Sequence, residues 1–482
     1  MRKIKIVSVA LILSAVLFFP FVFTMLFAVL TEEQFDRTFV GALDEKFDRL
    51  TSLEGEKIIV VGGSSVAFGL DSERLEKYTG MPVVNFGLYA SLGTKMMLDL
   101  SLAGVGKGDI VVVAPEINKE TLSLFFNADT AWRAVEGDFS MLGYIGFDNV
   151  PAMAGAVWGY SIDKLSRMRE KSADESGVGI YLSEYFNEYG DFAYPRMENV
   201  MHGYYDPNTL ISLSLDDYGE ELEEFIDYLN KYVKKCRRRG ASVYFTYSPM
   251  NELALTDASS AEACEEFAAY LEDKLICEII ETPEECILDG GYFYDTNFHL
   301  NDVGVELRTI RLAKALKLAA SITDAGVIKD KEPEAPTLPE IDVLYNGYDE
   351  NSVYFTYEKR PDGSFAITGL TDAGRNMESL TIPLGYEGYR VTAVKSGALA
   401  SEKLRSLTVS ADSYLAIFEN GAFLDTPNLT DLYIYKMSGD DIAPPTDFGG
   451  TGASFTVHIP RGSDFRDHYY WGERKVIYKE MD

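Results

Sequence analysis

Four short, largely apolar runs constrain the fold of this 482-residue chain more than any other feature. They cover residues 58–61, 83–84, 109–113 and 242–247, and helical patterns such as residues 94–103 and 218–239 lie between them. A strand without alternating polar positions is buried on both faces, and strands that alternate with helices form parallel sheets. The sequence therefore predicts an α/β domain over residues 56–322, a parallel sheet sandwiched by helices and closed by a helix near residues 302–322.

The N-terminus predicts a membrane anchor. Residues 1–5 are basic, and residues 6–30 contain no charge. A helix rising 1.5 Å per residue covers a hydrocarbon core about 30 Å thick over that length. Basic residues before the span place it with the N-terminus inside the cell. We expect residues 1–31 to form a cytoplasmic tip and single-pass signal-anchor, residues 32–55 a juxtamembrane helix, and the bulk of the chain to be extracytoplasmic. A cleaved signal peptide is the alternative, although no clean A-x-A site precedes Thr31, and export follows from both.

The charge of the chain argues against nucleic-acid binding. The formal net charge is −32, and no basic patch follows the first residues. Lys and Arg neutralise phosphates in most nucleic-acid complexes, so such an acidic chain is a poor candidate.

The cysteines give no sign of a metal or cofactor site. Their positions contain no CxxC element and fit no zinc pattern. Outside the cell they could pair, and three full pairings are possible, so buried thiols and a structural bridge both remain open. The four are Cys236, Cys264, Cys277 and Cys286. We expect no cofactor, because nucleotide-binding loops are also missing.

Residues from about 119 to 210 interrupt the alternation of strands and helices. The segment is rich in aromatic residues without a strong period. Such an insertion beside a sheet edge often forms a lid or a substrate surface. Its aromatic rings could stack on sugars, or they could form a small core of the insertion itself.

A charged, proline-rich linker over residues 323–345 precedes a region with an internal repeat. Over residues 346–482, strand-forming triplets that begin at Leu380, Leu407, Leu432 and Val457 recur at steps of 27, 25 and 25. A period in the twenties is typical of leucine-rich-repeat solenoids. Gly-Ala-Leu and Gly-Ala-Phe elements occupy matching places at residues 397–399 and 421–423. The repeated sequence resembles BspA-type repeats of bacterial surface proteins. We expect a small solenoid able to bind a protein or a glycan.

A serine-containing turn follows the first apolar run. Residues 61–69 read Val-Gly-Gly-Ser-Ser-Val-Ala-Phe-Gly. Small residues at the carboxyl end of a parallel strand let backbone amides approach a ligand, at the edge where open α/β sheets bind their ligands. The turn places Ser65 there.

A histidine and an acid stand close together near the end of the same domain. Residues 294–304 read Tyr-Asp-Thr-Asn-Phe-His-Leu-Asn-Asp-Val-Gly. A serine hydroxyl needs a nearby base, and a carboxylate must orient that base. Together, the two blocks resemble the first and last blocks of SGNH (GDSL-like) hydrolases, with Ser64 where aspartate is commoner, as in DltD-like relatives. The resemblance implies a flavodoxin-like sheet and a triad of Ser65, His299 and Asp295, although the acid is one residue further from the histidine than usual.

The resemblance weakens at the oxyanion hole. The family commonly uses the amide of the serine, a glycine amide after the second strand and an asparagine after the third. Here those positions imply the amide of Ser65, an amide of Gly87 or Ala90, and Asn118. The third block reads Ala-Pro-Glu-Ile-Asn over residues 114–118, and an ionised Glu116 cannot donate a hydrogen bond.

Two functions follow as hypotheses. The first is a membrane-anchored serine acyl esterase or O-acyltransferase acting on an acylated cell-envelope glycan or related polymer. The second is a non-catalytic surface binding protein that uses its repeats and a degenerate SGNH domain.

Overall fold

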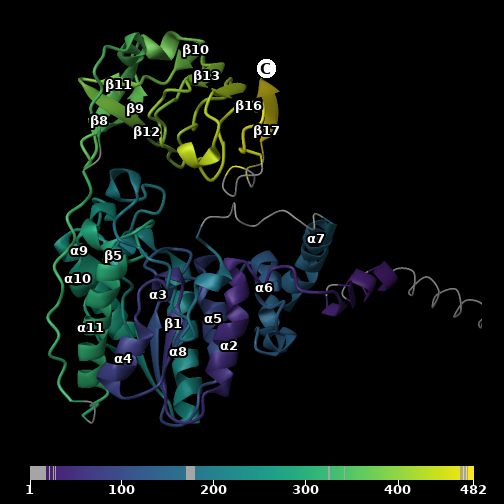
Figure 1. Ribbon diagram of the computed structural model, residues 1–482, viewed down its shortest axis with the longest axis vertical. Coiled ribbons are helices and arrows are strands. Elements are labelled where there is room, and N and C mark those ends of the chain that lie inside the picture. The colour runs from purple at the N-terminus through teal and green to yellow at the C-terminus, as the bar shows by residue number, and fades with distance from the viewer. Residues whose placement is uncertain are drawn as a thin grey trace, which may run out of the picture. The chain divides into compact units, whose positions relative to one another are not determined.

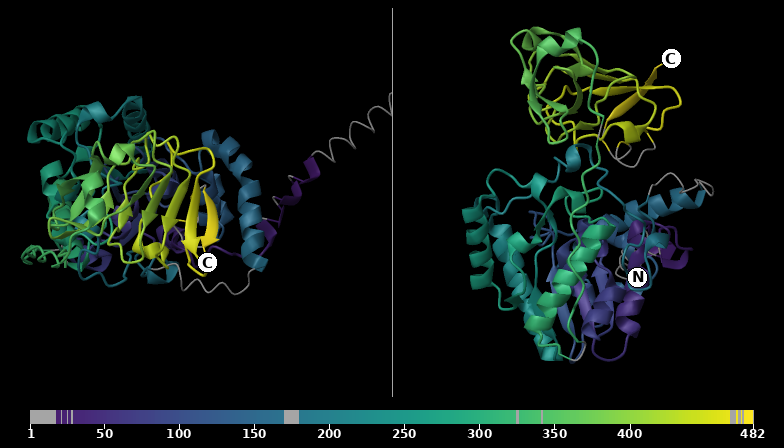
Figure 2. Two further views of the ribbon diagram at one scale, coloured as in Figure 1. Left: turned by 90° about the horizontal axis from the view of Figure 1, so that it is seen from above. Right: turned by 60° about the vertical axis from the view of Figure 1, so that its left-hand side comes forward.

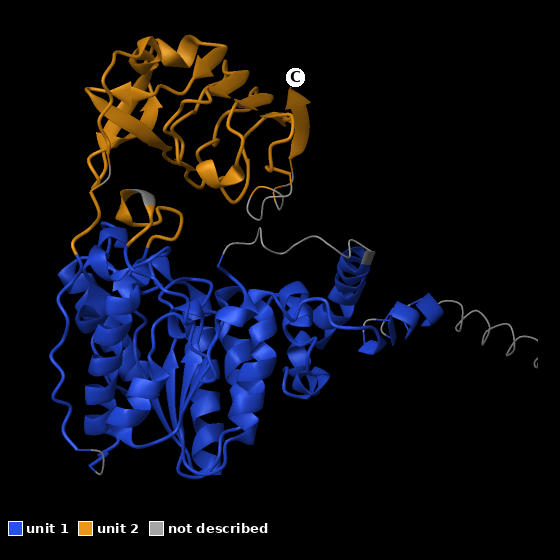
Figure 3. Ribbon diagram, viewed as in Figure 1, with its two compact units in different colours: residues 1–198, 211–336 blue, residues 199–210, 337–482 orange. Residues whose placement is uncertain are grey.

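The chain folds into two compact units. The structure, a computed structural model, describes residues 18–169, 180–323, 326–340, 342–466 and 476–481, apart from positions 21, 25 and 28, together with Trp471 and Arg474. Unit 1 comprises Met1–Glu198 and Ile211–Pro336, and unit 2 comprises Asn199–Leu210 and Thr337–Asp482 (Figure 3). Residues 199–210 therefore belong to unit 2, although the chain on both sides of them belongs to unit 1.

Unit 1 is built on a five-stranded parallel sheet. Its strand order is β2-β1-β3-β4-β6, and every pairing between neighbours is parallel. The order reverses direction between β1 and β3, and such a switch point opens a crevice at the carboxyl ends of the strands. The strands are β1 (Ile58–Gly62), β2 (Val83–Gly87), β3 (Ile110–Ala114), β4 (Ser242–Phe245) and β6 (Glu278–Ile279); β5 (Met250–Asn251) and β7 (Ile287–Leu288) form a separate pair.

Helices cover both faces of this sheet, as the absence of alternating polar positions predicts. Ile58 and Val60 of β1 share a buried cluster with Leu312 of α11, and α5 packs against β1. Figure 1 shows α4 and α11 on one side of the sheet and α2 and α5 on the other. The helices are α2 (Leu43–Ser52), α3 (Ser64–Ala67), α4 (Ser72–Thr79), α5 (Thr94–Ser101), α6 (Ala128–Ala134), α7 (Val150–Arg169), α8 (Glu220–Arg239), α9 (Ala261–Lys274), α10 (Pro283–Cys286) and α11 (Asp302–Ala319).

The aromatic side chains of the insertion divide between a core and the surface. Trp132 of α6 stacks on Tyr160 of α7 with 5.4 Å between ring centroids, and its Nε1 donates to the Met153 carbonyl. Tyr144 and Trp158 are instead 41% and 46% exposed. The insertion thus has a small core of its own and also leaves aromatic rings in contact with solvent.

The charged segment after α11 packs on unit 1 up to its end. Glu332 forms ion pairs with Arg311 (3.1 Å) and Lys314 (2.8 Å), and the Tyr292 hydroxyl donates to the Pro333 carbonyl. The first part of the predicted linker is therefore held along α11, and the division between the units falls after Pro336.

Unit 2 contains a second five-stranded parallel sheet, in which strands pair in the order of the sequence. Strands β10 (Ser379–Thr381), β13 (Ser406–Val409), β15 (Asp431–Ile434), β16 (Thr456–Pro460) and β17 (Ile477–Met481) lie side by side (Figure 2). The register pairs Leu380 with Leu407, Leu407 with Leu432, and Leu432 with Val457. All four side chains are buried in one core. The description of these repeats as a leucine-rich solenoid stays a prediction.

A second, mixed sheet completes unit 2. Its order is β11-β12-β9-β8, with β14 paired to β12. The strands are β8 (Phe355–Lys359), β9 (Phe365–Leu370), β11 (Gly385–Tyr386), β12 (Tyr389–Val394) and β14 (Ile417–Phe418).

The predicted anchor lies largely outside the described residues. Of residues 1–31, positions 1–17, 21, 25 and 28 are not described. In the remaining chain, no helix is long and apolar enough to cross a membrane.

All four cysteines are buried and free. Burial raises the pKa of the Cys277 thiol to about 11, so it stays protonated and unreactive at neutral pH. Of the two alternatives left open by the sequence, the structure has the buried thiols.

Candidate active site

The predicted nucleophile lies in a tight turn at the carboxyl end of β1. Gly63 precedes α3, which begins at Ser64. A Cβ atom on Gly62 would lie 2.4 Å from the Ala114 carbonyl oxygen, and one on Gly63 would lie 2.9 Å from Glu116 Oε1. The two glycines therefore allow β1, β3 and the loop after β3 to approach each other closely.

Ser65 is almost fully enclosed. It is 1% exposed, and its Oγ has no hydrogen-bond partner among the described residues. It lines a cavity of about 10 Å³ together with Ser248, Arg308 and apolar side chains of the sheet domain. Ser65 is thus enclosed by protein in this conformation.

His299 and Asp295 form a hydrogen-bonded pair. His299 Nδ1 lies 2.8 Å from Asp295 Oδ1. The loop that carries them is closed by a hydrogen bond from the Tyr294 N–H to the His299 carbonyl (2.9 Å), and Thr296 Oγ1 accepts the His299 N–H. The turn brings the two side chains together although three residues separate Asp295 from His299.

The electrostatics of the pair favour an ionised acid. Burial raises the pKa of Asp295, but the His299 ring and the hydrogen bonds from His299 and Tyr181 outweigh it, and the net pKa lies below the ordinary value. An ionised carboxylate on Nδ1 holds the imidazole in the tautomer whose Nε2 can accept a proton.

Aromatic side chains from three regions surround the pair. The Tyr181 hydroxyl donates to Asp295 Oδ2 (2.6 Å). The Phe68 ring, three residues after Ser65, stacks on His299 with 3.8 Å between centroids and 8° between planes. Phe39, from the segment before α2, contacts both Phe68 and Tyr181. The histidine therefore sits in an apolar cover to which the insertion and the segment predicted as juxtamembrane both contribute.

The structure does not join the serine to the histidine. His299 and Asp295 are in contact, whereas Ser65 Oγ makes no hydrogen bond. Catalytic hydrogen bonds are often long or unmade without substrate, and a serine reaches three positions by rotation about χ1. The described structure thus contains a hydrogen-bonded His299–Asp295 pair and a separate serine whose hydroxyl makes no hydrogen bond.

Of the predicted oxyanion-hole groups, the Gly87 amide already has an acceptor, and the Asn118 side chain is held through its oxygen. The Gly87 N–H donates to Asn85 Oδ1 (3.1 Å), and Asn118 Oδ1 accepts the N–H of Thr121 (2.9 Å) in a local turn. The backbone at Ala90 is close to the serine turn, since its Cα lies 3.6 Å from the position of a Cβ on Gly63. Gly87 also lies against the turn, because a Cβ on it would lie 2.7 Å from the Gly63 carbonyl oxygen.

Glu116 accepts a hydrogen bond from the Ser65 amide, the donor that an oxyanion would need. Its Oε1 accepts the Ser65 N–H (2.9 Å) and the Ser64 hydroxyl (3.0 Å), and its side chain is buried. The sequence carried a signal for this contact, because a glutamate stands in the third block where the family has an asparagine. No comparable signal exists for Tyr181, which is 114 residues from Asp295 in the chain.

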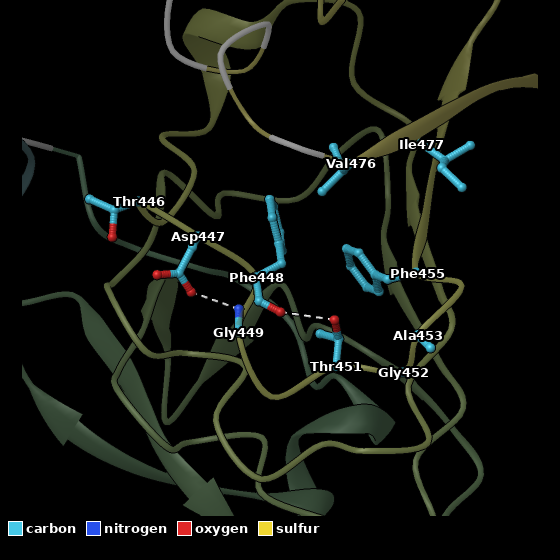
Figure 4. Close-up of a pocket in the computed structure, with 10 residues that line it drawn as sticks. All are labelled: Thr446, Asp447, Phe448, Gly449, Thr451, Gly452, Ala453, Phe455, Val476 and Ile477. Atoms are coloured by element: carbon cyan, nitrogen blue, oxygen red, sulfur yellow. Dashed lines mark hydrogen bonds between the residues drawn. The ribbon is translucent and has the colours of Figure 1, made fainter. Parts of the chain in front are cut away.

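A second cavity lies in unit 2. It has a volume of about 520 Å³ and is lined by residues 446–449, 451–453 and 455 with Val476 and Ile477 (Figure 4). Close to Val476 in the chain, residues 472, 473 and 475 are outside the described residues. Across the described residues, no group of three or more His, Cys, Asp or Glu side chains is arranged to hold a metal ion.

Comparisons of the chain with models of known protein families, with curated proteins and with solved structures found no match.

Proposed function

We propose that unit 1 is an SGNH-like serine acyl esterase or O-acyltransferase that acts on an acylated cell-envelope glycan or related polymer. The observation that carries the proposal is the His299–Asp295 pair at 2.8 Å, in the same unit as a serine turn at the carboxyl edge of the parallel sheet. The uncharged span at residues 6–30 supports attachment to the membrane and an extracytoplasmic location. The regular 25- to 27-residue spacing of the strands in unit 2 supports a BspA-type repeat unit that holds a protein or the polymer.

The reaction would proceed through an acyl-enzyme. Ser65 Oγ attacks the acyl carbonyl carbon while His299 Nε2 takes the hydroxyl proton, and the carbonyl electron pair moves onto oxygen. Collapse of this intermediate breaks the ester bond, and the departing alkoxide receives the proton from His299. Water or a sugar hydroxyl then attacks the acyl-enzyme by the reverse sequence, which frees Ser65. Asp295 stays ionised and stabilises the imidazolium.

A direct test is acetate release from O-acetylated glycan, together with labelling of the full chain by a fluorophosphonate. Ser65→Ala should abolish labelling and lower acetate release by about a thousandfold or more. Ser140→Ala, which removes an exposed serine of the insertion, should change neither. Absence of Ser65 labelling in every folded protein that retains this serine would count against the proposal.

The second candidate is a non-catalytic binding protein with a degenerate site. The contact of Glu116 with the Ser65 amide favours it, because that contact removes a donor that acyl transfer requires. Under this alternative, Ser65→Ala would leave binding of the chain to cell-envelope polymer unchanged, and acetate release would be absent in both proteins.

A further inference from the structure

Glu116 is a buried carboxylate that hydrogen-bonds to the serine turn. Its Oε1 accepts two hydrogen bonds at once, from the Ser65 amide and from the Ser64 hydroxyl. Hydrogen bonds to an ionised carboxylate are roughly twice as strong as neutral ones. The carboxylate is therefore a firm ligand of the turn and not a side chain that passes near it.

The loop after β3 fixes Glu116 in this position. The Thr121 hydroxyl donates to the Glu116 carbonyl oxygen, and the Asn118 N–H donates to the same carbonyl (3.1 Å). Gly63 has no side chain that would push the carboxylate away, since a Cβ there would lie 2.9 Å from Oε1. Loop and turn are thus shaped around the contact.

A carboxylate in this place opposes acyl transfer. The amide of a serine nucleophile lies beside the carbonyl oxygen that becomes the oxyanion, so it is a natural donor to that atom. Glu116 Oε1 already lies 2.9 Å from this amide. If the oxyanion formed there, it and the Glu116 carboxylate would place two negative oxygens against the same N–H, and their repulsion would be large.

We infer that Glu116 is an internal ligand that occupies the oxyanion site and keeps the resting enzyme closed, so that an acyl donor reacts only once the carboxylate leaves the Ser65 amide. This inference rests on the proposed acyl-transfer function and adds its regulation. The acyl oxygen and Glu116 compete for the same N–H. Loss of the carboxylate should therefore increase reactivity, which is the opposite of what mutation in an active site usually does.

The test measures the second-order rate at which a fluorophosphonate labels Ser65 in the full chain. In this reaction Ser65 Oγ forms a bond to phosphorus, fluoride leaves, the proton goes to His299, and the phosphoryl oxygen enters the oxyanion site. Glu116→Gln keeps the size of the side chain and replaces the charge with an amide that can donate. Glu116→Ala removes the acceptor entirely. We expect both variants to label faster than wild type by about ten- to a hundredfold, on the scale of one oxyanion donor.

Glu120→Gln is the matched control, because Glu120 lies on an exposed turn of the same loop. It should label at the wild-type rate. The inference is overturned if wild type labels at Ser65 and both Glu116 variants, folded by circular dichroism, label no faster. In that case Glu116 merely supports the turn and the proposed function survives. If no protein that retains Ser65 is labelled, including the Glu116 variants, the proposed function itself fails.

Discussion

At the scale of single residues, Asp295 combines two hydrogen bonds that have different origins. One oxygen pairs with His299, which the sequence places nearby, and the other accepts the Tyr181 hydroxyl from the insertion. The resemblance of this block to the last SGNH block predicted the first contact, although the acid lies one residue further from the histidine than usual. The second depends on the path of a long insertion, which no local pattern encodes.

The two contacts predict a graded effect on acetate release. Asp295→Asn should lower turnover by about ten-thousandfold, because it favours the wrong imidazole tautomer and removes the charge that stabilises the imidazolium. Tyr181→Phe removes one of the groups that lower the pKa of Asp295. It should lower turnover by about tenfold. Tyr185→Phe, a neighbouring aromatic of the insertion, serves as control and should have no effect. Equal losses for Asp295→Asn and Tyr181→Phe would contradict this ranking.

At the scale of elements, α2 is fixed to the sheet by a buried lysine. Lys46 Nζ donates to the carbonyls of Asn85 in the middle of β2 (3.2 Å) and of Gly190. Burial lowers the pKa of Lys46 to about 7, although Asp191 opposes the shift. The helical periodicity predicts a helix here, but it gives no reason to place a lysine inside.

This lysine should make stability depend on pH. Between about pH 7 and the ordinary value of 10.5, the unfolded chain binds a proton at Lys46 that the folded chain does not, so stability rises with pH. Urea denaturation should show a gain of about 1 to 2 kcal/mol from pH 7 to pH 8.5 relative to Lys46→Met, since one proton is worth about 1.4 kcal/mol per pH unit. Lys231→Met, on the exposed face of α8, should follow wild type. A parallel pH dependence in wild type and Lys46→Met would exclude this role.

The elements differ in how well the sequence predicts them. Strands β1 and β3 are recognisable because both faces are covered and every position is apolar. The closing helix was expected up to residue 322 and ends at Ala319. Helices α6 and α7 were not predicted, because an insertion with mixed exposed and buried aromatic residues has no clear amphipathic period.

At the scale of the whole molecule, each unit has its own core. Leu432 is fully buried at the centre of the parallel sheet of unit 2, between Leu407 and Val457. Leu432→Ala should destabilise unit 2 by about 2 to 5 kcal/mol through lost burial and a cavity. Calorimetry should show the loss, while fluorophosphonate labelling of Ser65 stays unchanged. Leu424→Ala, a half-exposed leucine of the same unit, should have little effect on stability.

The assignment of residues 199–210 to unit 2 bears on where the chain can be truncated and on how the two units became joined. Residues 199–210 are bound within unit 2, where Asn208 Oδ1 accepts the Asn420 N–H and the Tyr204 hydroxyl donates to the Pro339 carbonyl. Ending the gene after residue 336 would remove the hydrogen-bond partners of the Asn208 and Tyr204 side chains. The repeats are therefore not a detachable tail, and an ancestor that gained them by simple terminal fusion would also have had to adapt an internal loop.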